Sequence, residues 1–340
     1  EKKALLQGKE DADVLRVIIL AAGEGTRMGG TGPKSLLEVC GRPVLGYIID
    51  EVRKIVPEPV EIRVVVGHQH EKIRAKFEDA GLVWDYQPER LGTGHAVKIS
   101  LEAFPATEEG NVLVLPGAAP LITSASLNEL LDVHSDSGAD VTVLTGILEN
   151  PAGYGRIIRD EHGRIEKIVE EKELPPGGKA YYTEFNTGMY VFRERSLREA
   201  IEFLKPHEPK GEYYLTDSIF QIKSQGGKIE ALTLLQSEEG LGINTPRDLA
   251  RVISEMRKRI LWRLMESGVI IIDPESTFID STVEIGQGTI IYPFSVITGE
   301  VRIGKDCRVG PFSHIRTGTV LEDGAEIGNF TEVKNSRLGE

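Results

Sequence analysis

Cysteine is scarce in this sequence, which holds only Cys40 and Cys307 in 340 residues. Two distant cysteines give no disulfide framework and no zinc site, and they fit a reducing compartment. Long apolar runs are also missing, so no stretch of about 20 residues reads as a membrane-spanning helix. The charged segment 1–15 lacks the apolar core of a secretory signal and reads as an N-terminal extension. We therefore expect a cytoplasmic protein.

Positive charge is in the minority. The chain has 40 Lys and Arg residues and 53 Asp and Glu residues, which gives a formal net charge of −13. This balance argues against non-specific nucleic-acid binding, which needs a basic surface. An acidic chain can still bind an anionic nucleotide, but only in a local pocket lined by basic groups and amides.

Two halves of the chain have different periodicities. Over residues 16–244, β-rich runs that end in small residues (VLRVIILAA, EIRVVVG, GNVLVLPG, DVTVLTG) alternate with helical patterns. This alternation predicts a mostly parallel sheet covered by helices, with ligands bound beyond the carboxyl ends of the strands. Residues 245–266 predict a connecting helix that starts at Thr245 and Pro246.

Residues 267–340 carry a strict six-residue repeat. Ten aliphatic residues stand six apart: Ile279, Ile285, Ile291, Ile297, Ile303, Val309, Ile315, Leu321, Ile327 and Val333. A helix repeats near 3.6 residues, so a hexad instead predicts a parallel β-helix with three short strands per turn. A run of ordinary hairpins is the alternative, which ten repeats in one phase disfavour. Because no polar cap follows the last repeat, we expect the natural protein to continue beyond Glu340.

The segment LAAGEGTRM, residues 20–28, follows the first predicted strand, and Pro33-Lys34 comes four residues later. Small residues let backbone N–H groups approach a nucleotide, while Arg27 and Lys34 supply donors for phosphate oxygens. The spacing is neither GxGxxG nor a Walker loop. A tight turn with a purely structural role is the alternative.

LAAGEGTRM…PK resembles the signature of the sugar-nucleotide pyrophosphorylases. The short gap before Pro33-Lys34 is similar to the branch of bifunctional N-acetylglucosamine-1-phosphate uridyltransferases and glucosamine-1-phosphate acetyltransferases. Further matches are Gln87, LGTGHA (91–96), YGR (154–156), IVE (168–170), NTG (186–188), GIN (242–244) and the hexad region. The resemblance implies an α/β fold: a Rossmann-like nucleotidyltransferase domain followed by a left-handed parallel β-helix.

The resemblance also implies residue roles. Its nucleotide-binding positions are Leu20, Ala21, Ala22, Gly23, Gln87, Gly92 and Thr93. Arg27 and Lys34 would hold the triphosphate and the leaving pyrophosphate. Gly155, Glu170 and Asn186 would bind the sugar, and Asn244 would be one ligand of a Mg²⁺ cofactor. Arg316 and Lys334 would bind the acetyl acceptor, whereas the family's catalytic histidine and acetyl-coenzyme A site would lie beyond residue 340.

Some of these positions have plainer interpretations. Glu170 lies in an acidic loop, and Asn186 before Thr-Gly could simply form a turn. His95 is interpreted as structural, because the attacking phosphate is already ionised. Two histidines on one loop at the end of a strand, as His68 and His70 are, are more often solvated than bound to a metal.

The chain departs from the family at Ala118, where the family writes aspartate, the carboxylate ligand of its magnesium. A methyl group cannot bind a hard cation. Two explanations stay open: an engineered substitution that stalls the enzyme, or a natural sequence that has lost catalysis and kept binding. Pro116 stands where tyrosine is frequent.

The implied reaction is in-line attack of N-acetylglucosamine 1-phosphate on the α-phosphorus of UTP, giving UDP-N-acetylglucosamine for bacterial cell-wall synthesis. A catalytically inactive nucleotide-sugar-binding subunit and a transferase for another hexose phosphate are the alternatives. The family forms trimers through its β-helix. We expect a homotrimer here too, packed through flat faces with small residues such as Thr289, Ser295 and Ser313.

Overall fold

The computed structural model describes residues 14–23, 25, 28, 32–106, 110–175 and 181–339. The chain divides into two compact units, each with its own core. The first unit holds residues up to 36 together with 44–246, and the second holds 37–43 together with 247–340. Within the described residues, no helix is long and apolar enough to cross a membrane.

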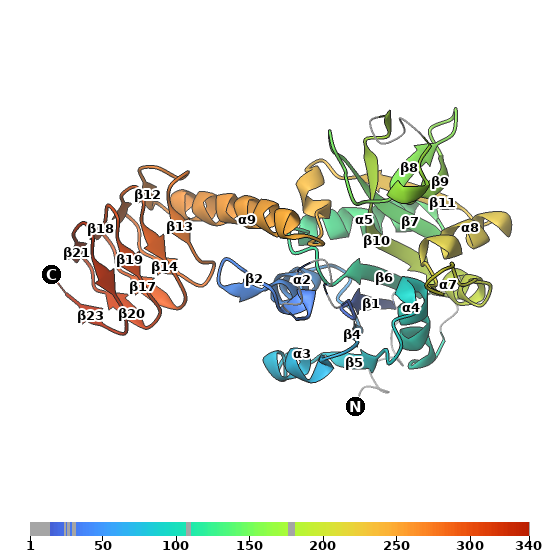
Figure 1. Ribbon diagram of the computed structural model, residues 1–340, viewed down its shortest axis with the longest axis horizontal. Coiled ribbons are helices and arrows are strands. Elements are labelled where there is room, and N and C mark those ends of the chain that lie inside the picture. Colours follow the sequence, from blue (N-terminus) through green and yellow to red (C-terminus); the bar gives the residue numbers. More distant parts are fainter. Residues whose placement is uncertain are drawn as a thin grey trace. The chain divides into compact units, whose positions relative to one another are not determined.

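The first unit is built on a sheet whose strands lie in the order β11-β7-β10-β6-β1-β4-β5 (Figure 1). In chain order these are β1 (Leu15–Leu20), β4 (Glu61–Val66), β5 (Val83–Tyr86), β6 (Asn111–Pro116), β7 (Val141–Ile147), β10 (Glu184–Arg193) and β11 (Ile229–Thr233). Neighbours pair in parallel, except that β10 runs antiparallel to β6 and β7. A hairpin of β8 (Arg156–Arg159) and β9 (Ile165–Val169) pairs with β10. The predicted mostly parallel sheet is confirmed, but β10 and β9 run opposite to the other strands.

Helices pack on this sheet in two groups. The α-helices are α2 (Val44–Val52), α3 (His70–Lys76), α4 (Gly92–Glu102), α5 (Ser124–Ser137), α7 (Glu194–Ile201) and α8 (Thr216–Ser224). Short 3₁₀ turns are η4 (Lys34–Leu36), η5 (Glu171–Glu173) and η6 (Ser237–Gly240). Residues of α4, α7 and α8 share one buried cluster with Ile18, Val114 and Phe192 of the sheet. Because side chains alternate along a strand, Val17, Ile19 and Leu113, which are also fully buried, face the opposite side.

Two charged networks are buried beside the sheet. Arg16 of β1 donates to Glu194 at the start of α7 at 2.6 Å, and neither side chain is more than 3% exposed. Arg63 of β4 donates to Asp85 of β5, which also accepts from Ser100 at 2.6 Å. Buried charges need such partners, so these pairs fix how distant segments meet.

The second unit joins a helix, a hairpin and a β-helix. Its helix is α9 (Pro246–Glu266), and the hairpin consists of β2 (Glu38–Val39) and β3 (Arg42–Pro43). The Cys40 carbonyl accepts from the backbone N–H of Ser281 at 3.0 Å and from its hydroxyl at 3.1 Å. Burial raises the pKa of the Cys40 thiol to about 11, so the thiol stays protonated at neutral pH. This hairpin was not predicted from the sequence.

The β-helix has three parallel sheets (Figure 1). The first contains β12 (Ile270–Ile271), β15 (Ile290–Ile291), β18 (Arg308–Val309) and β21 (Glu326–Ile327). The second contains β13 (Phe278–Ile279), β16 (Val296–Ile297), β19 (His314–Ile315) and β22 (Glu332–Val333). The third contains β14 (Glu284–Ile285), β17 (Val301–Ile303), β20 (Thr319–Leu321) and β23 (Arg337–Leu338). Ile279 pairs with Ile297, which pairs with Ile315, so one turn takes three hexads, as predicted.

The hexad residues point into the coil. All are buried except Ile285, which is half-buried near the first turn. Thr289, Ser295 and Ser313 are buried as well, at no more than 2% exposure. Their hydroxyls donate to carbonyls of the coil itself, for example Thr289 to Gly304 at 2.8 Å. The prediction that these three residues pack between chains is therefore wrong, because they fill the interior.

Candidate nucleotide site

A cavity of about 600 Å³ lies in the first unit at the carboxyl ends of β1 and β6. Beyond the strands, the turns stay in register, since Gly117 N–H donates to the Leu20 carbonyl at 2.8 Å and Ala21 N–H donates to the Val65 carbonyl at 2.8 Å. The predicted residues that line this cavity are Leu20, Ala21, Ala22, Gly23, Lys34, Gln87, Gly92, Thr93, Ala118 and Asn244. The sheet edge therefore gathers residues from five separate stretches of the chain.

Two glycines are required by close backbone approaches. A β-carbon at Gly117 would lie 2.9 Å from the Leu20 carbonyl oxygen. A β-carbon at Gly92, where φ is +90°, would lie 2.5 Å from the carbonyl oxygen of Tyr213. Only glycine fits at these places, so the glycines shape the cavity walls.

Gln87 is buried and its side-chain amide has a fixed orientation. Its Nε2 lies 3.1 Å from the Gly92 carbonyl oxygen and 3.1 Å from His95 Nδ1. A carbonyl oxygen only accepts, so the –NH₂ end must face Gly92 and His95. The Oε1 acceptor is the end left for a ligand. His95, interpreted from the sequence as structural, thus contacts a predicted base-reading residue.

Lys34, Ala118 and Asn244 line one end of the cavity. Lys34 Nζ donates to Asn244 Oδ1 at 2.7 Å, although the residues are 210 positions apart. Ile243 N–H donates to the Ala118 carbonyl at 2.8 Å, which holds the segment before Asn244 against the turn after β6. The Tyr154 hydroxyl bridges both backbone groups of Gly242 at 2.8 and 3.1 Å.

The donors at this end do not fit a magnesium ion held by the protein. Asn244 offers one neutral amide oxygen, which already accepts from the Lys34 ammonium. Ala118 presents a methyl group. Mg²⁺ in proteins is usually held by one or two carboxylates together with substrate phosphates. Within the described ranges, no group of three or more His, Cys, Asp or Glu residues gathers as a metal site.

The three predicted sugar residues cluster beside the cavity. Asn186 N–H donates to the Gly155 carbonyl at 2.9 Å, and a β-carbon at Gly155 would lie 3.6 Å from Glu170 Oε1. They are not among the residues that line the cavity, but Tyr190 connects them to it. Its hydroxyl lies 2.7 Å from Asn186 Nδ2, and burial raises the pKa of Tyr190 above its ordinary value. Tyr190 therefore stays a neutral hydrogen-bonding group.

Sequence reasoning missed part of the lining. Arg90 and five residues of the segment 210–216 also line the cavity: Lys210, Glu212, Tyr214, Leu215 and Thr216. The dense polar and aromatic sequence KGEYYLT was the available signal. Arg27, the predicted partner of Lys34, lies outside the described residues.

Arg316 and Lys334 belong to the second unit. They follow β19 and β22, which pair one coil apart, and Arg316 N–H donates to the Val333 carbonyl at 2.8 Å. The register thus stacks the two predicted acceptor-binding residues on adjacent coils. The Arg316 guanidinium also donates to Glu332 at 2.7 Å.

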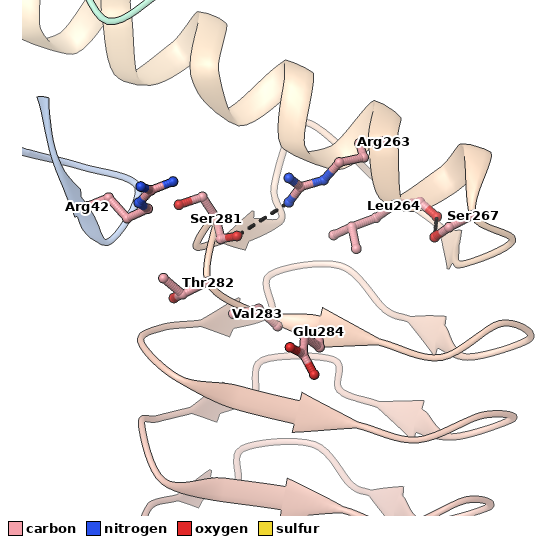
Figure 2. Close-up of a pocket in the computed structure, with 8 residues that line it drawn as sticks. All are labelled: Arg42, Arg263, Leu264, Ser267, Ser281, Thr282, Val283 and Glu284. Atoms are coloured by element: carbon pink, nitrogen blue, oxygen red, sulfur yellow. Dashed lines mark hydrogen bonds between the residues drawn. The ribbon is translucent and has the colours of Figure 1, made fainter. Parts of the chain in front are cut away.

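A second cavity, of about 500 Å³, lies in the second unit and is shown in Figure 2. Arg42 of the hairpin and Arg263 of α9 lie on either side of Ser281. However, Glu284 also lines it, and α9 ends beside it at Glu266. The carbonyls of a helix carboxyl end repel anions. This mixture of charges does not favour a phosphate or carboxylate ligand.

Known proteins resemble both units. Residues 17–204 match the family of MobA-like NTP transferase domains, and 282–316 and 300–335 match the bacterial transferase hexapeptide repeat. The bifunctional protein GlmU of Alkaliphilus metalliredigens is 41% identical over 95% of this chain and 69% of its own length. The chain belongs to the GlmU family.

Other members agree with this assignment. GlmU of Thermoanaerobacter pseudethanolicus is 43% identical over 85% of this chain. The chain's match spans about 62% of that relative's length. The solved structure of CMP:2-keto-3-deoxy-manno-octonic acid synthetase complexed with CTP shares the fold, with a TM-score of 0.54 at 16% identity. It covers 72% of this chain and 99% of its own.

Proposed function

We propose that the first unit transfers a uridylyl group from UTP to N-acetylglucosamine 1-phosphate. The observation that carries this proposal is one cavity that combines a buried amide acceptor, Gln87 Oε1, with the Lys34 ammonium. Membership of the GlmU family supports it. A structure of the same fold is complexed with a nucleoside triphosphate, CTP.

In this proposal, an oxygen of the sugar phosphate attacks the α-phosphorus of UTP, and the bond to the β-phosphate oxygen breaks to release pyrophosphate. Lys34 neutralises charge on the leaving pyrophosphate, and Gln87 Oε1 accepts from uracil N3–H. Asn186, Glu170 and the Gly155 backbone orient the sugar by hydrogen bonds. The protein's part is positioning and charge neutralisation, so no covalent intermediate is required.

Ala118 is expected to slow the reaction. Ala118→Asp should raise pyrophosphate release in the presence of magnesium by roughly 10²- to 10⁴-fold, since a carboxylate ligand supplies several kcal/mol of charge stabilisation. Ala118→Asn is the matched control, because it has the same shape without the charge. Equal turnover by all three proteins would contradict the role assigned to position 118.

A second candidate function is nucleotide-sugar binding without transfer, as in a regulatory subunit. The methyl group of Ala118 beside Asn244 favours it. Tight binding of UDP-N-acetylglucosamine, together with an Ala118→Asp variant that still releases no pyrophosphate, would support this candidate. Transfer to a different hexose phosphate in the same assay would instead revise the sugar.

Three further proposals concern the whole protein. Arg316 and Lys334, stacked on adjacent coils, would bind glucosamine 1-phosphate while its amine takes the acetyl group of acetyl-coenzyme A and the thiol leaves. The hexapeptide repeat supports assembly as a homotrimer, which a mass measurement by light scattering tests. A cytoplasmic location fits the nucleotide substrates.

A further inference from the structure

The triphosphate end of the cavity combines an ammonium, an amide and a methyl group where a metal-binding site would need carboxylates. We infer that this chain binds its nucleotide as the metal-free anion, with the Lys34 ammonium as the local cation. The inference rests on the proposed nucleotide site, but it makes a separate claim about the form of the ligand.

The position of the Lys34 ammonium is fixed by its surroundings. Lys34 belongs to η4, and its stem packs against Gly25, where an added β-carbon would lie 2.9 Å from Lys34 Cγ. At the other end, Nζ donates to Asn244 Oδ1 at 2.7 Å. The charge is therefore anchored at both ends of the side chain and directed to one place.

The partner of that ammonium is also held in place. Asn244 follows Ile243, whose N–H donates to the Ala118 carbonyl at 2.8 Å. Two residues earlier, Gly242 is held by the Tyr154 hydroxyl. These hydrogen bonds hold Ala118 and Asn244 at the same end of the cavity as Lys34. The side-chain oxygen of Asn244 already faces a positive charge.

The charged residues that line the rest of the cavity also favour a metal-free anion. Lys34, Arg90 and Lys210 are cationic, and Glu212 is the one carboxylate among the residues that line it in the described part of the chain. Glu212 itself lies 3.9 Å from the Lys210 ammonium. Such a lining attracts a fully charged triphosphate more strongly than one neutralised by magnesium. Among the described lining residues, no carboxylate other than Glu212 could reduce the repulsion between a nucleotide-bound magnesium ion and the Lys34 ammonium.

The test is a titration calorimetry series with UTP, in EDTA and in excess magnesium. For the unmodified chain we expect UTP to bind roughly fivefold or more tightly in EDTA, because the described lining residues carry more cationic groups than carboxylates. Ala118→Asn should keep that order, whereas Ala118→Asp should reverse it and favour magnesium. Lys34→Gln should weaken binding in EDTA by roughly tenfold or more, since a charge-assisted contact to phosphate is lost. Thermal unfolding of each variant confirms that it is folded.

The possible outcomes separate the two claims. If the unmodified chain binds UTP more tightly with magnesium than in EDTA, this inference is wrong and the proposed nucleotide site stands. If Ala118→Asp leaves the order of affinities unchanged, the assignment of position 118 to the metal end is also wrong. If UTP binds in neither condition, the proposed function fails together with the inference.

Discussion

Contacts of different sequence range stabilise the interior of the first unit and the interior of the β-helix in the second. In the first, the decisive side-chain contacts join distant segments: Arg16 meets Glu194 across 178 positions, and Lys34 meets Asn244 across 210. In the second, Ile297 lies between Ile279 and Ile315, one turn away on each side. The first unit can therefore gather a site from many turns, whereas the β-helix repeats one local arrangement.

The two units also place their charges differently. Glu194 is fully buried in the first unit, where it accepts from both Arg16 and Arg198. Ion pairs of the β-helix lie on its surface; in the pair of Arg302 with Glu284, for example, 74% and 70% of the side chains are exposed. Exposed pairs contribute little to stability. The β-helix must depend mainly on its stacked aliphatic interior, and the first unit depends also on its buried polar contacts.

Glu194→Gln should give the largest loss of stability. It leaves the Arg16 guanidinium buried without its full countercharge, and breaking a buried pair costs about 3–5 kcal/mol. Unfolding in urea can be followed by Trp84 of β5 in a Trp262→Phe background, so that the signal reports the first unit alone. Glu199→Gln, which removes an exposed partner of Arg195, is the matched control and should change the free energy by about 0.5 kcal/mol or less. Similar losses for both variants would contradict the importance of the buried pair.

Ile315→Ala should damage the second unit alone. Ile315 is fully buried between Ile297 and Val333, and such a truncation costs about 2–5 kcal/mol. Ile285→Ala, at the half-buried position, should cost less. Hydrogen exchange should show lost protection in the coils next to residue 315, with the amides of β1 and β6 unchanged. Equal loss of protection in both units would show that they unfold together and that the contrast drawn here fails.

The β-helix could be predicted to the residue because each position's neighbours follow from one period. Ile279, Ile297 and Ile315 must stack once three hexads make a turn. The same reasoning failed for Ser295 and Ser313. The six-residue period shows that they occupy equivalent positions, but it does not show whether their side chains point into the coil. Only the observed burial and hydrogen bonds settle it.

The candidate site was less predictable. The turns after the strands identified Lys34 and the glycines, and the resemblance supplied Gln87 and Asn244. The reversed direction of β10 and the hairpin 38–43 have no recognisable pattern in the sequence, because each depends on contacts between distant segments. The Lys34–Asn244 contact and the lining by residues 210–216 depend on the packed sheet edge in the same way.

The smallest expected effect is a change of base selectivity in His95→Ala, and it tests whether one contact at the sheet edge determines ligand choice. His95 Nδ1 and the Gly92 carbonyl together hold the Gln87 –NH₂ group, so that Oε1 is left to accept from N3–H of uracil. Cytosine carries an unprotonated N3 acceptor at that position, which Oε1 would repel. Without His95, one of the two contacts on the amide is lost, and Gln87 can turn part of the time to present –NH₂ to cytosine.

We therefore expect the ratio of the dissociation constants for CTP and UTP to fall by about three- to tenfold in His95→Ala, in line with the modest worth of a single hydrogen bond. His95→Gln, which can restore an acceptor near the same place, should recover part of the selectivity, as no purely structural defect would. His70→Ala is the matched control, because His70 packs against Tyr86 with ring centroids 4.6 Å apart and does not line the cavity. Titration of both nucleotides into each variant in EDTA gives the ratios. An unchanged ratio in His95→Ala would mean that the Gly92 carbonyl alone orients Gln87, and base choice would then depend on the backbone of this turn and not on the histidine.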